Sequence, residues 1–317
     1  MIICKRKIQK RIVRMERRKM LEELKKCEIC PRNCKVNRIE GKIGNCRATD
    51  KVEISLVSLH QYEEPCISGE NGSGTIFFTH CNLHCIFCQN YEISQLKKGR
   101  QTGIEELAQI MLKQQERKAE NINLVTPTMY AYQIKEAIKI ARRKGLTIPI
   151  IYNSNGYEKV ETLKELEGYI DVYLPDLKYY SDEMAIKYAK APNYFKIATK
   201  AILEMIRQVG TPQFDEKGMI QKGVMIRHLV LPNHKQNTKH ILQWMKQNIP
   251  EEVYINIMAQ YFPSYKAKED LLLNRKLTKK EYQEIEEYFY LLDFKHGYIQ
   301  ELGEHEEEYV PIWNENF

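Results

Sequence analysis

A chain of 317 residues is long enough for one large α/β domain or two smaller ones, and its composition, 43% hydrophobic and 29% charged, is that of a soluble globular protein. No segment reaches the roughly 18 unbroken apolar residues of a membrane span, and no apolar secretory signal follows the basic start, so we expect a cytoplasmic protein that does not enter a membrane. The net charge of +7 is concentrated in residues 1–26, which carry eleven Lys or Arg and three Glu. The remaining chain has a balance of −1, which argues against a nucleic-acid-binding surface on the globular part.

Residues 5–26 place apolar side chains at helical spacing among the basic ones, which predicts an amphipathic surface helix. Docking of an acidic redox partner is one alternative role for this segment. Binding of RNA or of a membrane surface is another.

Four cysteines follow the basic segment in the pattern C-x2-C-x3-C-x11-C, separated by turn-forming Pro, Asn and Gly: Cys27, Cys30, Cys34 and Cys46. Because a cytoplasm keeps thiols reduced, clustered cysteines indicate a metal rather than disulfides. Four thiolates suit a closed zinc site or an iron–sulfur cluster, and the spacing alone does not choose between them. We expect a structural metal knuckle within residues 1–50, with an electron relay as the alternative.

Short apolar runs and helical patterns alternate over the rest of the chain. Residues 52–60 alternate as a half-buried strand, and a capping-box pattern of Thr102 and Glu105 predicts a helix that extends to about residue 119. Buried strands are predicted at 75–79, 122–125, 149–152, 170–174, 223–231 and 253–258, and helices at 132–144, 159–167, 181–190, 194–209, 236–248 and 278–291. This order indicates right-handed crossovers and a parallel sheet. We expect a partial (β/α)6 barrel; the alternative, a doubly wound open sheet, would need a Gly-rich dinucleotide motif that does not follow the first strand.

Three further cysteines, Cys81, Cys85 and Cys88, follow the strand at 75–79 in the pattern C-x3-C-x2-C. Four thiolates would close a site, whereas three leave one metal position free for a ligand that is not protein. Three thiolates could hold three irons of a 4Fe-4S cluster, so that the fourth iron binds a small chelating ligand. The apolar residues between the cysteines would shield such a cluster from water.

Polar loops follow all six predicted strands, and in parallel α/β folds the carboxyl ends of the strands gather on one face. After the cysteine loop, these polar loops cover residues 126–130, 153–157, 175–178, 232–234 and 259–264. We therefore expect one site, built at this face around the cysteine loop.

Several local sequences match a known pattern: CEICPRNC at 27–34, EPCISG at 64–69, GSGTIFF at 72–78, CNLHCIFCQN at 81–90, YNSNGY at 152–157, DLK at 176–178 and MAQYFP at 258–263. Together they resemble the radical S-adenosylmethionine (SAM) superfamily, and within it the branch similar to pyruvate formate-lyase activating enzyme called PflX. The resemblance extends over nearly the whole chain. It implies a partial TIM barrel whose 4Fe-4S cluster reductively cleaves SAM to methionine and a 5′-deoxyadenosyl radical, which abstracts hydrogen from a substrate.

The resemblance also assigns roles to individual residues. Cys81, Cys85 and Cys88 would bind the cluster, and Phe87 would contact the adenine of SAM. Further contacts to SAM are expected from Thr126, Thr128, Asn153, Ser154, Asp176, Lys178 and Arg227. A carboxylate can pair with a sulfonium or with ribose hydroxyls, and Lys or Arg with the methionine carboxylate.

Two positions depart from the family pattern. The segment 126–128, Thr-Pro-Thr, replaces the Gly-Gly-Glu that holds the methionyl amine, so this contact would come from backbone carbonyls or threonine hydroxyls. Asn153 stands where the activating enzyme has Asp, which removes a charge from the expected monovalent-cation site.

We therefore expect a radical SAM oxidoreductase, by analogy the activator of a glycyl-radical enzyme, with residues 51–300 as the barrel and 301–317 as a solvated tail. Radical modification of a peptide, nucleotide or metabolite is the alternative within enzymes. The rival from another class is a non-catalytic zinc or iron–sulfur module that holds RNA or a protein through the basic arm. Reduced flavodoxin or ferredoxin is the expected electron donor, and Cys4 and Cys66 have no assigned role.

Overall fold

The structure is a computed structural model that describes residues 18–303, 311 and 313. Of the helix expected at 5–26, the described part is helical from residue 18 to residue 25, and the remainder lies outside the described residues. Cys4 and most of the expected tail at 301–317 also lie outside the described residues. In the part that is described, residues 301–303 are exposed, as expected, but Pro311 and Trp313 are half-buried.

A ten-stranded, mostly parallel sheet forms the centre of the molecule, in the order β10-β9-β8-β6-β5-β4-β2-β1-β3, with β7 paired to β8. The strands are β1 Val52–His60, β2 Ser73–Phe78, β3 Arg100–Thr102, β4 Ile122–Val125, β5 Ile150–Ser154, β6 Val172–Pro175, β7 Gln213–Phe214, β8 Ile220–Leu229, β9 Tyr254–Met258 and β10 Gly297–Ile299. The six predicted buried strands are β2, β4, β5, β6, β8 and β9, and each is parallel to its neighbours in this set. The predicted parallel α/β sheet is therefore confirmed, and β10 extends it by one more parallel strand.

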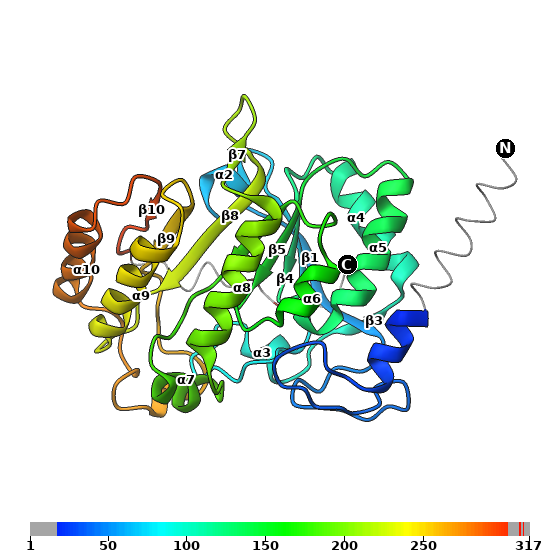
Figure 1. The fold of residues 1–317 in the computed structure, drawn as a ribbon, viewed down its shortest axis with the longest axis horizontal. Helices are drawn as coiled ribbons and strands as arrows, with labels where there is room; N and C mark the ends of the chain where they lie inside the picture. Colours follow the sequence, from blue (N-terminus) through cyan, green and yellow to red (C-terminus); the bar gives the residue numbers. More distant parts are fainter. Residues whose placement is uncertain (1–17, 304–310, 312, 314–317) are drawn as a thin grey trace, which may run out of the picture.

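The two ends of the sheet differ. At one end β1 pairs antiparallel with both β2 and β3, and at the other end β10 pairs parallel with β9. Within the described residues, no strand pairing joins β3 to β10. In Figure 1, β9, β10 and α10 lie at one end of the molecule, and α4, α5 and β3 at the other.

Helices and 3-10 turns separate most of the strands along the chain. They are α2 Pro65–Ser68, α3 Tyr91–Ser94, α4 Ile104–Glu116, α5 Ala131–Arg143, α6 Val160–Glu165, α7 Asp182–Ala189, α8 Tyr194–Val209, α9 Lys235–Asn248 and α10 Lys279–Leu291, with single 3-10 turns η1 Thr128–Tyr130 and η2 Tyr265–Glu269. The spacing of buried apolar residues explains them. In α5, Ile134, Ala137, Ile138 and Ala141 recur every three or four positions and are buried, so one stripe of the helix faces the sheet.

The capping box expected at Thr102 is wrong. Thr102 ends β3 and pairs with Val52 of β1, so its backbone belongs to the sheet rather than to a helix terminus. Helix α4 begins after Gly103 and ends at Glu116, before the predicted residue 119. A capping box does form at the start of α10, where the side chain of Thr278 accepts from the backbone N–H of Glu281.

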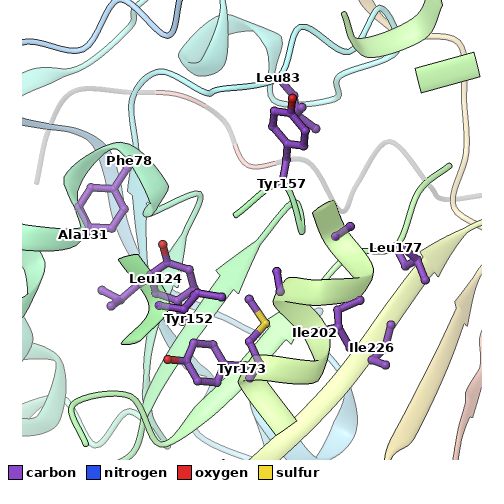
Figure 2. Packing of buried hydrophobic residues seen from close by; sticks show 14 of the residues in the cluster. Phe78, Leu83, Leu124, Ala131, Tyr152, Tyr157, Tyr173, Leu177, Ile202 and Ile226 are labelled. Carbon is purple, nitrogen blue, oxygen red and sulfur yellow. The ribbon is translucent and has the colours of Figure 1, made fainter. Parts of the chain in front are cut away.

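The core lies around the central strands, whose residues are buried on both faces. All residues of β2, β4, β5 and β6 are buried, as in parallel sheets that are covered on both sides. Figure 2 shows Leu124 of β4 beside Tyr152 of β5, and Tyr173 of β6 next along the sheet; the two tyrosine rings are 5.8 Å apart between centroids. No helix in the described part of the chain is both long and apolar enough to cross a membrane.

Candidate radical SAM site

Cys81, Cys85 and Cys88 lie in the loop that follows β2, and all three line a cavity of about 210 Å³ at the carboxyl ends of the parallel strands. The cavity also brings together most of the residues expected to contact SAM: Phe87, Thr126, Asn153, Ser154, Asp176, Lys178 and Arg227. Phe87 comes from the cysteine loop after β2, and the other side chains come from the loops and ends of β4, β5, β6 and β8. The structure therefore assembles them at the face of the sheet where the sequence places them.

Each of the three sulfurs has a polar neighbour. Asn155 Nδ2 donates to Cys81 Sγ at 3.3 Å, and Ser94 Oγ lies 3.3 Å from Cys88 Sγ. The hydroxyl of Tyr179 donates to Cys85 Sγ at 4.0 Å. Such hydrogen bonds stabilise thiolates and tune the reduction potential of a bound cluster.

Burial raises the pKa of all three thiols, to about 12 for Cys85. Lys178 opposes this rise at Cys85 by electrostatic attraction. Thiols with raised pKa values become thiolates only when a cation compensates their charge, so this donor set fits a soft-metal cluster. Among residues 18–303, 311 and 313, no group of three or more His, Cys, Asp or Glu side chains has the spacing to hold a metal ion. The assignment of metals to the cysteine sets therefore rests on the cavities and on the chemistry of the donors.

Phe87 is buried in the middle of the cysteine loop, with its ring 5.9 Å from that of Tyr261 and 6.5 Å from that of Tyr179. The loop itself is anchored from both sides. Asn82 Nδ2 donates to the carbonyl of Tyr157 at 2.8 Å. On the other side, the backbone N–H of Ile86 donates to the carbonyl of Tyr188 at 2.9 Å. These contacts fix where the three sulfurs point.

A charged network lies beside the cysteines. Lys178 Nζ donates to Asp176 Oδ2 at 2.6 Å, and Asp176 Oδ1 lies 3.5 Å from Arg227 Nε. Arg227 also donates to Glu63 Oε2 at 2.8 Å and to Asn153 Oδ1 at 2.6 Å. Arg227 is thus an ion-pair partner within the site, and it links β8 to β5 and to the loop after β1.

Thr126 has a φ of 60°, a left-handed conformation that is unfavourable for a β-branched residue. It lies directly after β4 and lines the cavity, so local backbone strain coincides with the candidate site. Thr128 does not line this cavity. Thr128 begins the 3-10 turn η1, and its buried hydroxyl donates to Glu158 Oε1 at 2.5 Å.

Sequence reasoning missed several residues of the site. Asn155 was placed in a polar loop without a role, although it donates to Cys81 and accepts from the backbone of Tyr157. Glu63 was missed because its loop comes before the first parallel strand rather than after one. Two adjacent acids in front of a proline were the only signal for it.

Cys27, Cys30, Cys34 and Cys46 line a separate small void of about 10 Å³, which is close to the space of a single water-sized sphere. Backbone turns bring them together; for example, the N–H of Asn45 donates to Cys34 Sγ at 3.3 Å. We refer to residues 27–48 as the knuckle.

Arg38 lies beside this void and is almost fully buried, with 1% of its surface exposed. Its guanidinium donates to the carbonyls of Thr49 and Met129 and lies 4.0 Å from Cys27 Sγ, and no carboxylate in the described part of the chain pairs with it. Burial raises the pKa of Cys46, and Arg38 lowers it. A buried cation needs an anionic partner, and thiolates bound to a metal would supply one.

The knuckle packs directly on the cysteine loop. Arg32 Nε donates to the carbonyl of Asn82 at 2.9 Å, and Asn45 Oδ1 lies 2.8 Å from His84 Nε2. The knuckle is also joined to the end of the β5 loop, where Lys159 Nζ donates to the carbonyl of Glu28 at 3.0 Å. In Figure 1 these dark-blue loops lie below α6 and beside α3.

Comparison with known proteins identifies the family. Residues 75–245, which run from β2 into α9 and make up more than half of the chain, match the Radical SAM superfamily, and the chain belongs to it. Membership implies an enzyme that uses a 4Fe-4S cluster and SAM.

Two proteins of Methanocaldococcus jannaschii are similar in sequence. The uncharacterised protein MJ0674 is 36% identical over 272 residues, which cover 83% of this chain and 72% of that protein. The uncharacterised protein MJ0808 is 24% identical over 262 residues, which cover 76% of this chain and 72% of that protein.

Among solved structures, Streptococcus suis SuiB bound to precursor peptide SuiA has a TM-score of 0.50 and 13% sequence identity. The match covers 72% of this chain and 48% of SuiB, so the chain spans about half the length of that protein. At this identity the likeness concerns the fold alone.

Proposed function

We propose that this radical SAM enzyme belongs to the PflX branch, similar to pyruvate formate-lyase activating enzyme, and that its parallel strands form a partial (β/α)6 barrel over residues 51–300. The proposal rests on one observation. A single cavity at the strand ends is lined by all three cysteines of the C-x3-C-x2-C loop and by six of the seven strand-end residues expected to contact SAM.

Cys81, Cys85 and Cys88 would hold the 4Fe-4S cluster, and Asn155, Ser94 and Tyr179 would donate hydrogen bonds to their sulfurs. When bound, the cluster and SAM supply the chemistry of the superfamily, reductive cleavage of SAM to methionine and a 5′-deoxyadenosyl radical.

The chain itself would bind and orient SAM. Lys178 and Arg227 would attract its carboxylate, and Asp176 would accept from its ribose or offset its sulfonium. The interlocked ion pairs of these three side chains keep them in place before SAM arrives. The ring of Phe87 would pack against the adenine, and Thr126, Asn153 and Ser154 would provide the remaining polar contacts, whereas Thr128 would act only through Glu158.

The substrate by family analogy is a glycyl-radical enzyme. A peptide is the second candidate, supported by the fold shared with SuiB, which was crystallised with a precursor peptide. Modification of a nucleotide or a metabolite by the same radical is a further alternative. A non-catalytic zinc module that holds RNA or a protein is the rival outside enzymes, and it predicts zinc at both cysteine sets.

For the knuckle we propose a structural zinc ion bound by its four cysteines. The small void and the buried Arg38 favour a compact anionic centre, and the hydrogen bonds to Asn82 and His84 make the knuckle a support for the cysteine loop. A second iron–sulfur cluster that relays electrons is the alternative. Reduced flavodoxin or ferredoxin would supply electrons, and the basic arm of residues 1–26 would dock these acidic proteins.

The function is tested by anaerobic reconstitution with iron and sulfide, followed by measurement of 5′-deoxyadenosine formed from SAM with dithionite. Wild type is expected to form it, and Cys81→Ala to form none, because the cluster loses one of its three ligands. Cys66→Ala is the matched control: Cys66 is buried near Tyr298, outside both cysteine sets, and this variant should retain activity. Full iron loading of wild type without any 5′-deoxyadenosine would contradict the proposal.

The role of the basic arm is tested separately by deletion of residues 1–17. Turnover with reduced flavodoxin should fall, because the arm carries much of the positive charge, whereas turnover with dithionite should not change. Equal turnover with flavodoxin before and after the deletion would rule out a docking role.

A further inference from the structure

A second cavity of about 380 Å³ adjoins the cysteine cavity and lies between the two ends of the open sheet. Its walls come from both ends, His60 of β1 and Phe77 of β2 on one side and Asn256 of β9 and Tyr298 of β10 on the other. Arg227 lines both cavities. A ligand in the second cavity would therefore lie next to SAM, and the volume is in the range of small-molecule and side-chain pockets.

Two residues of the cavity wall, Glu64 and Asn256, carry buried oxygens that have no hydrogen-bond partner among the described residues. Asn256 Nδ2 donates to Glu64 Oε1, while Glu64 Oε2 and Asn256 Oδ1 have no hydrogen-bond partner among the described residues. The two residues are only 6% and 7% exposed. An unsatisfied buried polar group costs about 1–3 kcal/mol, so a small shift of the two side chains toward a ligand that donates hydrogen bonds to both oxygens would be favourable.

The wall carries more carboxylates than cationic side chains. Glu63 and Glu64 face one guanidinium, that of Arg227, which donates directly to Glu63 and lies 3.9 Å from Glu64, beyond hydrogen-bond distance. Burial raises the pKa of Glu64, and the attraction of Arg227 offsets only part of this rise. A second cation in the cavity would stabilise the ionised form of Glu64.

Aromatic rings form much of the remaining wall. Tyr62, Phe77 and Tyr298 line the cavity together with His60, whose pKa is lowered by burial so that its ring is neutral near pH 7. Faces of aromatic rings attract cations, including the ammonium group of a lysine.

From these observations we infer that the cavity binds the substrate through a primary ammonium group, held by Glu64 Oε2 and Asn256 Oδ1 and flanked by the aromatic rings. The group belongs either to a lysine side chain of a peptide or to a small free amine. The inference rests on the proposed function in one respect, that the neighbouring cavity holds the cluster and SAM.

The test uses reconstituted protein with SAM and without reductant, and measures the binding of paired probes by calorimetry. The peptide pair is acetyl-Gly-Lys-Gly-amide and its norleucine analogue, and the free pair is pentylamine and pentan-1-ol. In at least one pair the ammonium probe should bind about tenfold tighter than the neutral one, and Glu64→Gln should remove this difference, a change of about 1.4 kcal/mol. The pair that shows the difference identifies the source of the ammonium group.

Two variants complete the design. Glu116→Gln makes the same chemical change at an exposed residue near the end of α4 and should retain the discrimination. Asn256→Ala removes the second acceptor and should weaken only the ammonium probe, so it carries the test if Glu64→Gln does not fold. In both cavity variants the Kd for SAM should stay within about twofold of wild type.

The inference is overturned by equal binding of charged and neutral probes in both pairs, or by discrimination that survives Glu64→Gln and Asn256→Ala. A loss of SAM affinity in Glu64→Gln as large as the loss of probe affinity would also overturn it, because Glu64 would then belong to the cofactor site. Since no reductant is present, these results do not depend on SAM cleavage, whose failure is detected separately by the assay for 5′-deoxyadenosine.

Discussion

Gly156 has a conformation and surroundings that no other residue type fits. Its φ is 77°, and a Cβ atom there would lie 2.2 Å from the carbonyl oxygen of Asp176. The loop after β5 can therefore approach the loop after β6 only because residue 156 is glycine.

Gly156→Ala should displace Asp176 and its ion pairs, weaken SAM binding by about tenfold or more and lower the free energy of unfolding by more than about 2 kcal/mol. Gly168→Ala is the matched control, since its φ is 81° and no atom lies within 4 Å of the added methyl group. Calorimetric SAM binding and urea unfolding of both variants check this. Equal effects of the two substitutions would show that the contact with Asp176 has no role.

For single residues, the sequence and the family resemblance gave candidates, and the structure shows where each of them lies. Asp176 and Arg227 were expected at SAM from the family resemblance; the structure brings both to the cavity, and their contact with SAM stays a prediction. Thr128 was expected at SAM but contacts Glu158, since a 3-10 turn after β4 rotates it away. Glu64 was seen only as part of a motif, because its partner Asn256 lies 192 positions away in the sequence.

At the scale of elements, the knuckle is the part whose role is least determined by its sequence. Its four cysteines have spacing suited to zinc and to iron–sulfur clusters alike. The structure adds its contacts to the cysteine loop, through Arg32 and Asn45.

Replacement of Cys27, Cys30, Cys34 and Cys46 by Ala should remove about one zinc per chain and leave about four irons, because each set would bind its own metal. The variant should also lose stability, by several kcal/mol, since a structural zinc contributes directly to folding. Metal analysis by mass spectrometry and thermal unfolding check this. Loss of about four irons with unchanged zinc would identify a second cluster instead.

Buried strands were the most predictable elements, because parallel strands covered on both faces are continuous apolar runs. All six were found within three residues of their predicted ends. The short strands β3, β7 and β10 were not predicted, since they have two or three residues and no continuous apolar run. Their pairing depends on neighbouring strands that local sequence does not reveal.

At the scale of the whole molecule, His228 couples stability to pH. It is buried between the strand-end loop after β6 and helix α9, with Nδ1 2.6 Å from the carbonyl of Leu177 and Nε2 2.9 Å from the hydroxyl of Thr238. These contacts suit the neutral ring, and burial lowers its pKa to about 4.

Between about pH 6.5 and pH 4 the unfolded chain binds a proton at His228 that the folded chain does not, so stability should fall as the pH is lowered through this window. The loss attributable to His228 is at most about 3 kcal/mol. Urea unfolding at pH 7 and pH 4.5 should show a smaller loss for His228→Gln than for wild type. His240→Gln, at an exposed histidine, should behave as wild type; an equal loss in His228→Gln would contradict this account.

The central claim is that the loop of Cys81, Cys85 and Cys88 leaves one iron of a 4Fe-4S cluster open to SAM. Electron paramagnetic resonance of the reduced, reconstituted protein tests it most directly, because direct binding of SAM to an iron changes the spectrum of the cluster. The account predicts a clear change in the g-values when SAM is added to wild type, and no 4Fe-4S signal from this loop in Cys81→Ala. A fully loaded wild-type cluster whose spectrum is the same with and without SAM would contradict it.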